Sequence, residues 1–272
     1  MLQENIKKLL RTIIRHDYVE VMFRGNAAIA AALGMVHFSK KVLIPEEGGW
    51  LSYRTLPGTL GLSVKEVHCV DARIDLGALE TMLKLGGVGA LLYQNPGGYF
   101  AQQPMKEIYS LCKRYNCLVI LDISGAIGTL LWDGKSADVL VGSFGQGKLV
   151  NAGCGGFISC GSKELWERLR SRSMELLKDD TQLQFVLEAL EKLPGRIELL
   201  QQERAKVLHD LKAFKIVHPQ DYGFGVVVRY DGEVEREIII EYCALYKLEW
   251  KPCPRYIRLN DKAISIELKR IN

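Results

Sequence analysis

Short apolar runs alternate with amphipathic segments over the first two-thirds of the chain. Runs such as LVILD at 118–122 and VGALLY at 88–93 are nearly continuous, as in strands that are covered on both faces. Strand alternating with helix at this spacing predicts an α/β fold, a three-layer sandwich around a mainly parallel sheet. The predicted strands are 41–45, 64–70, 88–94, 117–124, 137–144 and 156–160, and the predicted helices are 26–38, 75–85 and 104–115.

The last third of the chain has a different pattern. Leu and charged residues recur at helical spacing over 162–211, with a break at Leu193-Pro194-Gly195. The final segment predicts a strand, a helix and two further strands, at 225–230, 233–248, 256–259 and 263–268. We therefore expect a large domain over 1–211, ending in linking helices, and a small C-terminal α+β domain over 212–272.

Composition and charge narrow the class of protein. Lys plus Arg total 36 and Asp plus Glu 32, a net charge of +4 without a long basic run, so we expect no nucleic-acid partner. No apolar stretch reaches the roughly 18 residues of a membrane-spanning helix. Residues 1–16 have helical spacing interleaved with Lys and Arg, unlike a signal peptide. These features predict a cytoplasmic protein with no membrane partner.

Cysteine and histidine do not form a recognisable ligand pattern. The seven cysteines are an odd number without disulfide-framework spacing, and the five histidines are scattered singly. A structural zinc site needs paired ligands, so we expect no metal site.

In a parallel sheet, binding and catalytic residues lie beyond the carboxyl ends of the strands. Asp122 lies near the end of the predicted strand 117–124, two residues before Ser124. A partly buried carboxylate at this place needs a metal, an Arg or a protonated ring nitrogen as partner. A helix cap or a surface turn is the alternative interpretation.

A lysine among glycines follows the strand at 137–144. Lys148 lies between Gly147 and a glycine-rich segment that leads into the next strand. Desolvation there makes a lysine a nucleophilic amine. The spacing Gly142-x-x-x-x-Gly147-Lys148 resembles a phosphate loop, but Leu149 stands where that loop needs Ser or Thr, and no helix pattern follows.

Two further features lie near predicted strand or helix ends. Gly25, Asn26 and Ala27 begin an Ala-rich helix, whose exposed amides suit a phosphate, although Asn26 also fits an ordinary helix cap. Trp50 follows two glycines and is able to stack on a planar ring or to pack over the sheet edge. Together with Asp122 and Lys148 they match the needs of pyridoxal 5′-phosphate (PLP): a Schiff-base lysine and an acidic partner for the ring nitrogen.

On these residues the chain resembles fold-type-I PLP-dependent enzymes, and most closely the DegT/DnrJ/StrS aminotransferases. That family has a Ser-Phe-x-x-x-Lys segment before a Gly-Gly strand, and this chain has Ser143-Phe144-Gly145-Gln146-Gly147-Lys148 before Gly155-Gly156. The resemblance implies PLP in the large domain, a Schiff base at Lys148, ring-nitrogen pairing by Asp122, phosphate contact by Ser143, and a homodimer. It places Gly25, Asn26 and Ala27 at the phosphate turn and Trp50 on the ring.

The chain departs from the family pattern in three ways. Gly125 stands three residues after Asp122, where family members often have Gln or His on the ring hydroxyl, and Ser124 is the substitute we expect. Asn26 replaces the usual Thr, and the chain is shorter than typical members.

Substrate residues are predicted from the rim of the same sheet edge. Asn95 and Tyr99 lie in the segment after the strand at 88–94, with a plain turn as the equal alternative. Arg258, with Arg229 and Arg255, is a candidate for a substrate carboxylate, although we expect all three to be exposed surface arginines.

The predicted function is therefore a PLP-dependent aminotransferase acting on a small-molecule amino donor and a keto acceptor, with keto sugars as one class. A PLP-dependent lyase or desulfurase is the second hypothesis, because Lys251 and Arg255 near Cys253 favour a reactive thiol, although a structural cysteine is the stronger interpretation. A non-catalytic protein of the same fold is the third, favoured by the short chain and by Gly125.

Overall fold

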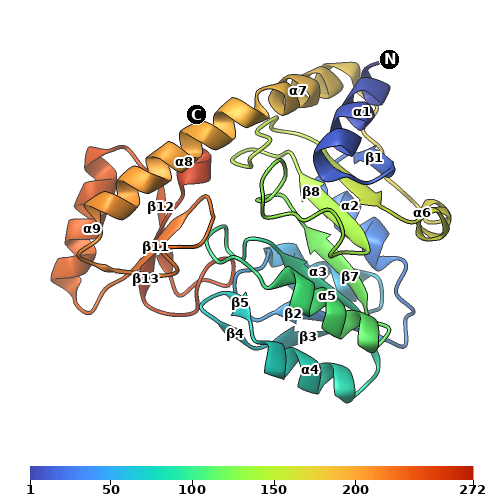
Figure 1. Ribbon diagram of the computed structural model, residues 1–272, viewed down its shortest axis with the longest axis horizontal. Helices are drawn as coiled ribbons and strands as arrows, with labels where there is room; N and C mark the ends of the chain where they lie inside the picture. The colour runs from blue at the N-terminus through green and yellow to red at the C-terminus, as the bar shows by residue number, and fades with distance from the viewer. Residues whose placement is uncertain (272) are drawn as a thin grey trace.

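The computed structural model describes residues 1–271 and contains a seven-stranded sheet (Figure 1). Its strand order is β1-β9-β8-β7-β6-β2-β3. All pairings are parallel except those of β9, which is antiparallel to both neighbours. The predicted mainly parallel sheet is therefore confirmed. The strands are β1 (Tyr18–Met22), β2 (Lys41–Pro45), β3 (Ser63–Val67), β6 (Val88–Gln94), β7 (Leu118–Asp122), β8 (Val139–Ser143) and β9 (Gly156–Cys160).

Helices cover both faces of this sheet because its strands are apolar on both sides. In β6, Ala90 and Leu92 belong to one hydrophobic core, while Leu91 and Tyr93 belong to the other. The first core contains α2 (Gly25–Leu33), α3 (Leu51–Thr59) and α6 (Lys163–Arg170). The second contains α1 (Leu2–Ile14), α4 (Leu76–Lys84), α5 (Met105–Arg114) and α7 (Asp180–Glu191). This arrangement confirms the three-layer sandwich.

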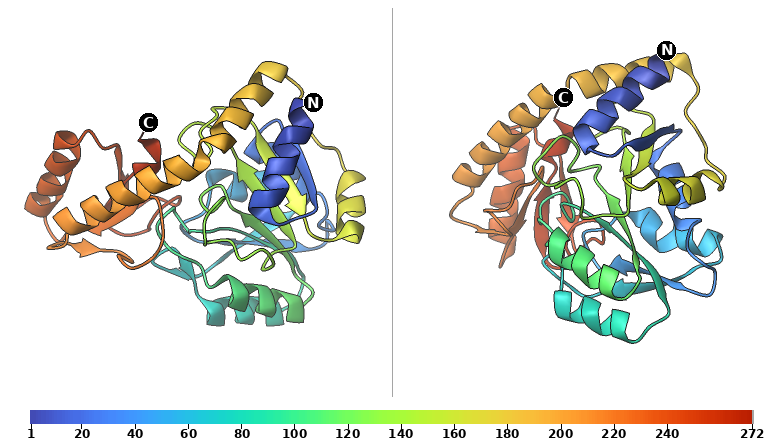
Figure 2. Two further views of the ribbon diagram at one scale, coloured as in Figure 1. Left: turned by 45° about the horizontal axis from the view of Figure 1, so that its top comes forward. Right: turned by 45° about the vertical axis from the view of Figure 1, so that its right-hand side comes forward.

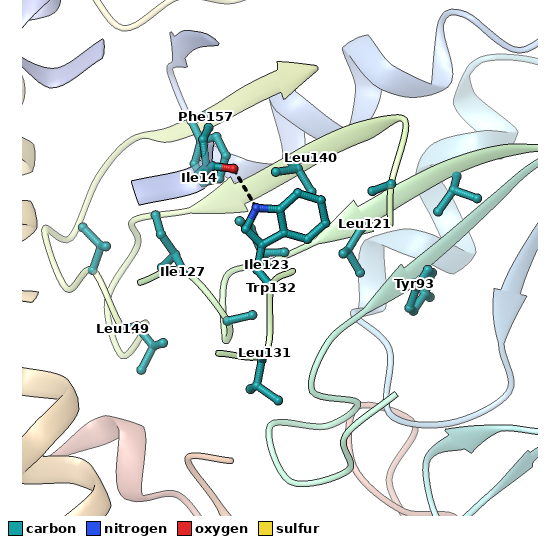
Figure 3. Close-up of a cluster of buried hydrophobic side chains, with 14 of the residues drawn as sticks. Ile14, Tyr93, Leu121, Ile123, Ile127, Leu131, Trp132, Leu140, Leu149 and Phe157 are labelled. Atoms are coloured by element: carbon teal, nitrogen blue, oxygen red, sulfur yellow. Dashed lines mark hydrogen bonds between the residues drawn. The ribbon is translucent and has the colours of Figure 1, made fainter. Parts of the chain in front are cut away.

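The second core also fixes the chain that leaves the carboxyl end of β7. Figure 3 shows Trp132 packed among Leu121, Ile123 and Leu140, with its indole N–H bonded to the carbonyl of Ile14, at 2.7 Å. The loop after Asp122 is thus anchored to the end of α1.

A long helix, α8 (Leu193–Asp210), runs from the large sheet to a separate C-terminal unit (Figure 2). That unit is a four-stranded antiparallel sheet with α9 (Glu233–Leu245) packed against it, an α+β arrangement as predicted but with one strand more than the sequence indicated. Its strands, in spatial order, are β10 (Lys215–Ile216), β11 (Val226–Arg229), β13 (Ala263–Ile266) and β12 (Trp250–Cys253), followed in sequence by a 3-10 turn, Leu268–Arg270. A small hairpin, β4 (Cys69–Val70) with β5 (Arg73–Ile74), completes the molecule.

The predicted strand at 256–259 is wrong. The strand that pairs with the outer side of β13 is β12 instead, an edge strand that tolerates Pro252. Residues 256–259 form a turn in which Arg255 N–H bonds the carbonyl of Leu259, at 2.7 Å. Tyr256 and Ile257 suggested a strand because they are hydrophobic, but they are hydrophobic because they pack into the core between the large sheet and helices α2, α3 and α6.

Several elements of the fold were not predicted from the sequence, namely β1, α3, β5, β10 and β12. Within residues 1–271, no helix is both long and apolar enough to span a membrane, and no cluster of three or more His, Cys, Asp or Glu is arranged to hold a metal ion.

Candidate active site

Asp122 ends β7 and is buried at the carboxyl edge of the sheet. One carboxylate oxygen accepts the Tyr53 hydroxyl at 2.8 Å, and the other accepts the backbone N–H and hydroxyl of Ser124, at 2.8 and 2.6 Å. Burial, with the nearby Asp122 charge, raises the pKa of Tyr53 well above its usual value. This phenol therefore stays protonated and donates a hydrogen bond to Asp122. The three partners of Asp122 are all neutral.

Lys148 follows β8 in a loop shaped by glycine. Gly147 has φ +70° and donates its N–H to the Asn151 side chain at 2.8 Å. The Lys148 ammonium donates to the Tyr99 hydroxyl at 2.9 Å and lies 4.3 Å from the centre of the Trp50 ring. An amine and an aromatic face are therefore held side by side.

Helix α2 begins directly beside the end of β8. A Cβ at Gly25 would lie 2.6 Å from the Cβ of Ser143, so only glycine allows this close approach. Arg24 makes no side-chain cap, so the first amides of the helix stay open to a ligand. Asn26 accepts the Trp50 indole N–H at 3.3 Å, which makes it a support for the ring rather than a cap.

These elements enclose one cavity of about 200 Å³. Of the residues predicted for the cofactor, all but Ala27 line it; Ala27 lines a neighbouring groove. The lining residues are Arg24, Gly25, Asn26, Ile29, Trp50, Asp122, Ser124, Val141, Gly142, Ser143 and Lys148. A small cavity with an open helix start, an aromatic wall, a buried acid and an amine fits a phosphorylated aromatic aldehyde such as PLP.

Ser124 and Ser143 link the two sides of the cavity floor. The Ser124 hydroxyl, which donates to Asp122, accepts the backbone N–H of Ser143 at 2.8 Å. The Ser143 hydroxyl accepts the N–H of Gly145 at 3.2 Å, at the start of the lysine loop. Ser124 is thus committed to orienting Asp122.

The three predicted substrate residues have different surroundings. The Asn95 side chain is occupied by bonds to other parts of the large unit: it donates to the carbonyl of Leu131 at 2.7 Å and accepts the N–H of Gln103 at 3.0 Å. Tyr99 contacts Lys148 directly. Arg258 is buried and paired with Glu267, so the expectation of an exposed side chain is wrong for this arginine.

The partners of Arg258 form a buried charged cluster that the sequence did not reveal. Glu267 accepts Arg258 Nε at 2.7 Å and Lys269 Nζ at 2.8 Å. Burial opposes the charge of Glu267, but Arg258 and Lys269 outweigh it and hold its pKa far below the usual range. Burial, with the Arg258 charge, lowers the pKa of Lys269 to about 8 despite the attraction of Glu267. Lys269 lies 4.8 Å from the Tyr99 ring, and no local pattern in the sequence marked it.

Comparison with known proteins agrees with this site. Residues 88–191, which include Asp122, Ser143 and Lys148, match the model of the DegT/DnrJ/EryC1/StrS aminotransferase family. The match confirms the resemblance predicted from the sequence, and with it an enzyme of the aminotransferase class whose cofactor is PLP. A comparison with curated sequences finds no match.

Solved structures show the same fold at low sequence identity. The PseC aminotransferase of Helicobacter pylori aligns with a TM-score of 0.81 and 14% identity, over 98% of this chain and 85% of that one. The 3-amino-5-hydroxybenzoic acid synthase aligns with a TM-score of 0.77 and 14% identity, over 98% and 85%. A serine palmitoyltransferase solved with a PLP internal aldimine aligns with a TM-score of 0.74 and 15% identity, over 97% and 71%. The fold is that of PLP-dependent transferases.

Proposed function

We propose that the chain is a DegT-type aminotransferase that holds PLP as a Schiff base on Lys148 and moves an amino group from a donor to a keto acceptor. Keto sugars are the acceptor class to test first. The observation that supports this proposal is the convergence of Asp122, Lys148, Trp50 and the start of α2 on one cavity of about 200 Å³.

Each wall of the cavity has one role in holding the cofactor. The open amides at Gly25 and Asn26, with the Ser143 hydroxyl, bind the phosphate. Trp50 stacks on the ring, and Asp122 pairs with the ring nitrogen and keeps it protonated. PLP, when bound in this way, supplies an electron sink for the bond-making and bond-breaking steps.

Lys148 has two successive tasks. Its amine would hold PLP as a Schiff base until an amino donor took its place. The amine freed in this way would act as a general base and then as a general acid beside the reacting carbons. Its position between Trp50 and Tyr99 keeps this amine at the cavity and restricts its motion.

The desulfurase hypothesis has no support in the thiol chemistry. Cys253 is buried in β12, and burial raises the pKa of its thiol although Arg258 and Arg255 act in the opposite direction. A buried neutral thiol is a poor nucleophile. The non-catalytic alternative is separated from an aminotransferase by the half-reaction described next.

The first test is the absorption spectrum of the protein with added PLP. We expect a visible band in the wild type and in Lys262→Ala, a control that removes an exposed lysine, and its loss in Lys148→Ala. Borohydride reduction followed by peptide mass analysis identifies the attached lysine. No band in the wild type would refute the proposal.

A half-reaction with amino donors then tests turnover. Loss of the band with release of a keto acid indicates an aminotransferase. A stable band with every donor indicates a non-catalytic binder.

Three further features belong to the same proposal. A homodimer is implied by the resemblance and is tested by light scattering in solution. Division into units at 211/212 is tested by limited proteolysis, and a cytoplasmic location by cell fractionation.

A further inference from the structure

Tyr99 lies in the turn after β6, held by both units of the molecule. Its φ is +71°, a conformation that bulky residues rarely adopt. Its N–H bonds the carbonyl of Pro96 at 3.1 Å, and its carbonyl accepts the N–H of Phe224, in the small unit, at 2.7 Å. The surrounding structure therefore maintains a strained backbone that places this side chain, which is 2% exposed.

The Tyr99 ring fills the space beside Gly125, three residues after Asp122. A Cβ on Gly125 would lie 2.9 Å from Cδ1 of Tyr99 and 3.2 Å from Cδ of Pro96. A longer side chain at position 125 is thus incompatible with this ring. Gly125 and Tyr99 are therefore complementary: Gly125 has no side chain, and the Tyr99 ring, from another loop, occupies the space that such a side chain would need.

The Tyr99 hydroxyl has an accepting and a donating capacity. It accepts the Lys148 ammonium at 2.9 Å, which leaves its own proton available. Burial raises the pKa of Tyr99, although the Lys148 charge acts in the opposite direction, so the phenol is neutral near pH 7.

The charges that face Tyr99 are mostly positive. Arg258 lies 5.4 Å and Lys269 4.8 Å from its ring, and Lys148 lies at its hydroxyl. Glu267 is paired with both Arg258 and Lys269. Asp122 acts on the Tyr99 hydroxyl only through its charge, without a hydrogen bond between them.

In PLP the ring hydroxyl oxygen is on the carbon next to the one that bears the aldehyde. A group that touches the lysine nitrogen is therefore within reach of that oxygen when the lysine is attached. We propose that Tyr99 is a positioning residue that accepts a hydrogen bond from free Lys148 and donates one to the ring oxygen of bound PLP. This inference rests on the proposed function and adds a residue from outside the Asp122 turn.

The test is Tyr99→Phe, which keeps the ring that packs on Gly125 and removes only the hydroxyl. The measurement is the midpoint pH of the absorbance change of the Lys148-bound cofactor. The Tyr99 donor stabilises the negative charge of the ring oxygen and so weakens the attraction of that oxygen for the proton on the neighbouring nitrogen, which makes the proton easier to lose. Without the donor we expect the midpoint to rise by about one pH unit, the effect of losing one hydrogen bond to a charged group.

Tyr93→Phe is the matched control. Tyr93 is also fully buried, and its hydroxyl has no hydrogen-bond partner within residues 1–271. We expect its midpoint to equal that of the wild type.

The outcomes separate the two proposals. A wild type that forms no adduct refutes the proposed function. An adduct whose midpoint is unchanged or lower in Tyr99→Phe overturns the role of Tyr99 and leaves the proposed function intact. Circular dichroism and thermal melting check that both variants are folded.

Discussion

The two units of the molecule each bury a carboxylate close to Tyr99, but the two carboxylates have different partners. Glu267, in the small unit, is bonded by the two cations Arg258 and Lys269 and by the Ser265 hydroxyl. Asp122, in the large unit, has only the neutral donors Tyr53 and Ser124, and it lines a cavity. Burying a charge is costly unless it is paired, so Asp122 still needs a cation and Glu267 does not.

The difference in partners indicates that Glu267 has a structural role and Asp122 a ligand-binding role. A carboxylate whose charge is balanced inside the protein stabilises the arrangement of its own neighbours. A carboxylate that has hydrogen bonds but no cation is oriented for a ligand that brings the positive charge. The protonated ring nitrogen of PLP supplies such a charge.

The largest expected effect comes from removing the Asp122 charge. Asp122→Asn keeps the size of the side chain and its ability to bond Ser124, but it no longer favours a protonated ring nitrogen. We expect PLP to remain attached at Lys148 and the half-reaction with an active donor to slow about a thousandfold, within the range for groups that act on proton transfer.

Asp138→Asn is the matched control for that change. Asp138 accepts the N–H of Val119 at 2.8 Å and pairs with Lys113 at 2.9 Å, away from the cavity-lining residues. The half-reaction rate of Asp138→Asn should stay within about twofold of the wild type, because a substitution remote from the cavity affects the stability of the fold and not the cofactor. An Asp122→Asn rate equal to that of this control would remove the distinction between the two carboxylates.

The next effect is on stability and comes from Glu267. Glu267→Gln leaves Arg258 and Lys269 buried without a compensating charge, which costs about 3 kcal/mol of unfolding free energy. Urea unfolding at pH 7 measures this loss. Glu249→Gln, which breaks an exposed pair with Arg270, should change stability by less than about 1 kcal/mol. Equal stability of the two variants would contradict the argument from burial.

The smallest expected effect is on the pH dependence of stability, and it comes from the buried side chain of His16, whose hydrogen-bond partner is neutral. His16 is bonded to the Ser159 hydroxyl at 3.1 Å, and burial lowers its pKa to about 4 from 6.5, although Asp17 acts in the opposite direction. Between these pH values the unfolded chain takes up a proton that the folded chain does not. Protonation therefore favours unfolding, and stability falls as pH drops from 6.5 towards 4.

Replacing His16 should flatten this pH dependence. Between pH 7 and 4.5, the wild type should lose about 2 kcal/mol more of its unfolding free energy than His16→Gln does. Denaturant titrations at both pH values measure the difference, with His37→Gln as the exposed control. A wild type and His16→Gln with parallel profiles would show that His16 is protonated alike in both states.

The sequence predicted those elements of the fold that are marked by their own residues, and it missed those that depend on contacts with distant parts of the chain. The bounds of β2, β6 and β9 agree with their predictions because each strand is a mostly apolar run. Helix α3 was missed because Pro57 and Gly58 interrupt a short segment that tertiary packing nevertheless keeps helical. The supposed strand at 256–259 owed its apolar residues to contact with the large unit, which no local pattern can express.

The same distinction applies to the site. Asp122, Ser143 and Lys148 were found because they lie in short motifs at strand ends, and the structure places them on one cavity. Tyr53 was missed because it comes from the helix that was missed. Lys269 approaches Tyr99 from the 3-10 turn Leu268–Arg270, more than a hundred residues away in sequence, and only the fold brings it there.

The loop that carries Trp50 is supported by residues close to the C-terminus. Gly48 donates its N–H to the carbonyl of Tyr256 at 2.8 Å, and the Glu47 carboxylate accepts the N–H of Asn260 at 2.6 Å. Both contacts join positions more than two hundred residues apart in the chain, so the aromatic wall is fully supported only when the small unit is folded against the large one. Binding of the cofactor in the large unit therefore depends on the docking of the small unit.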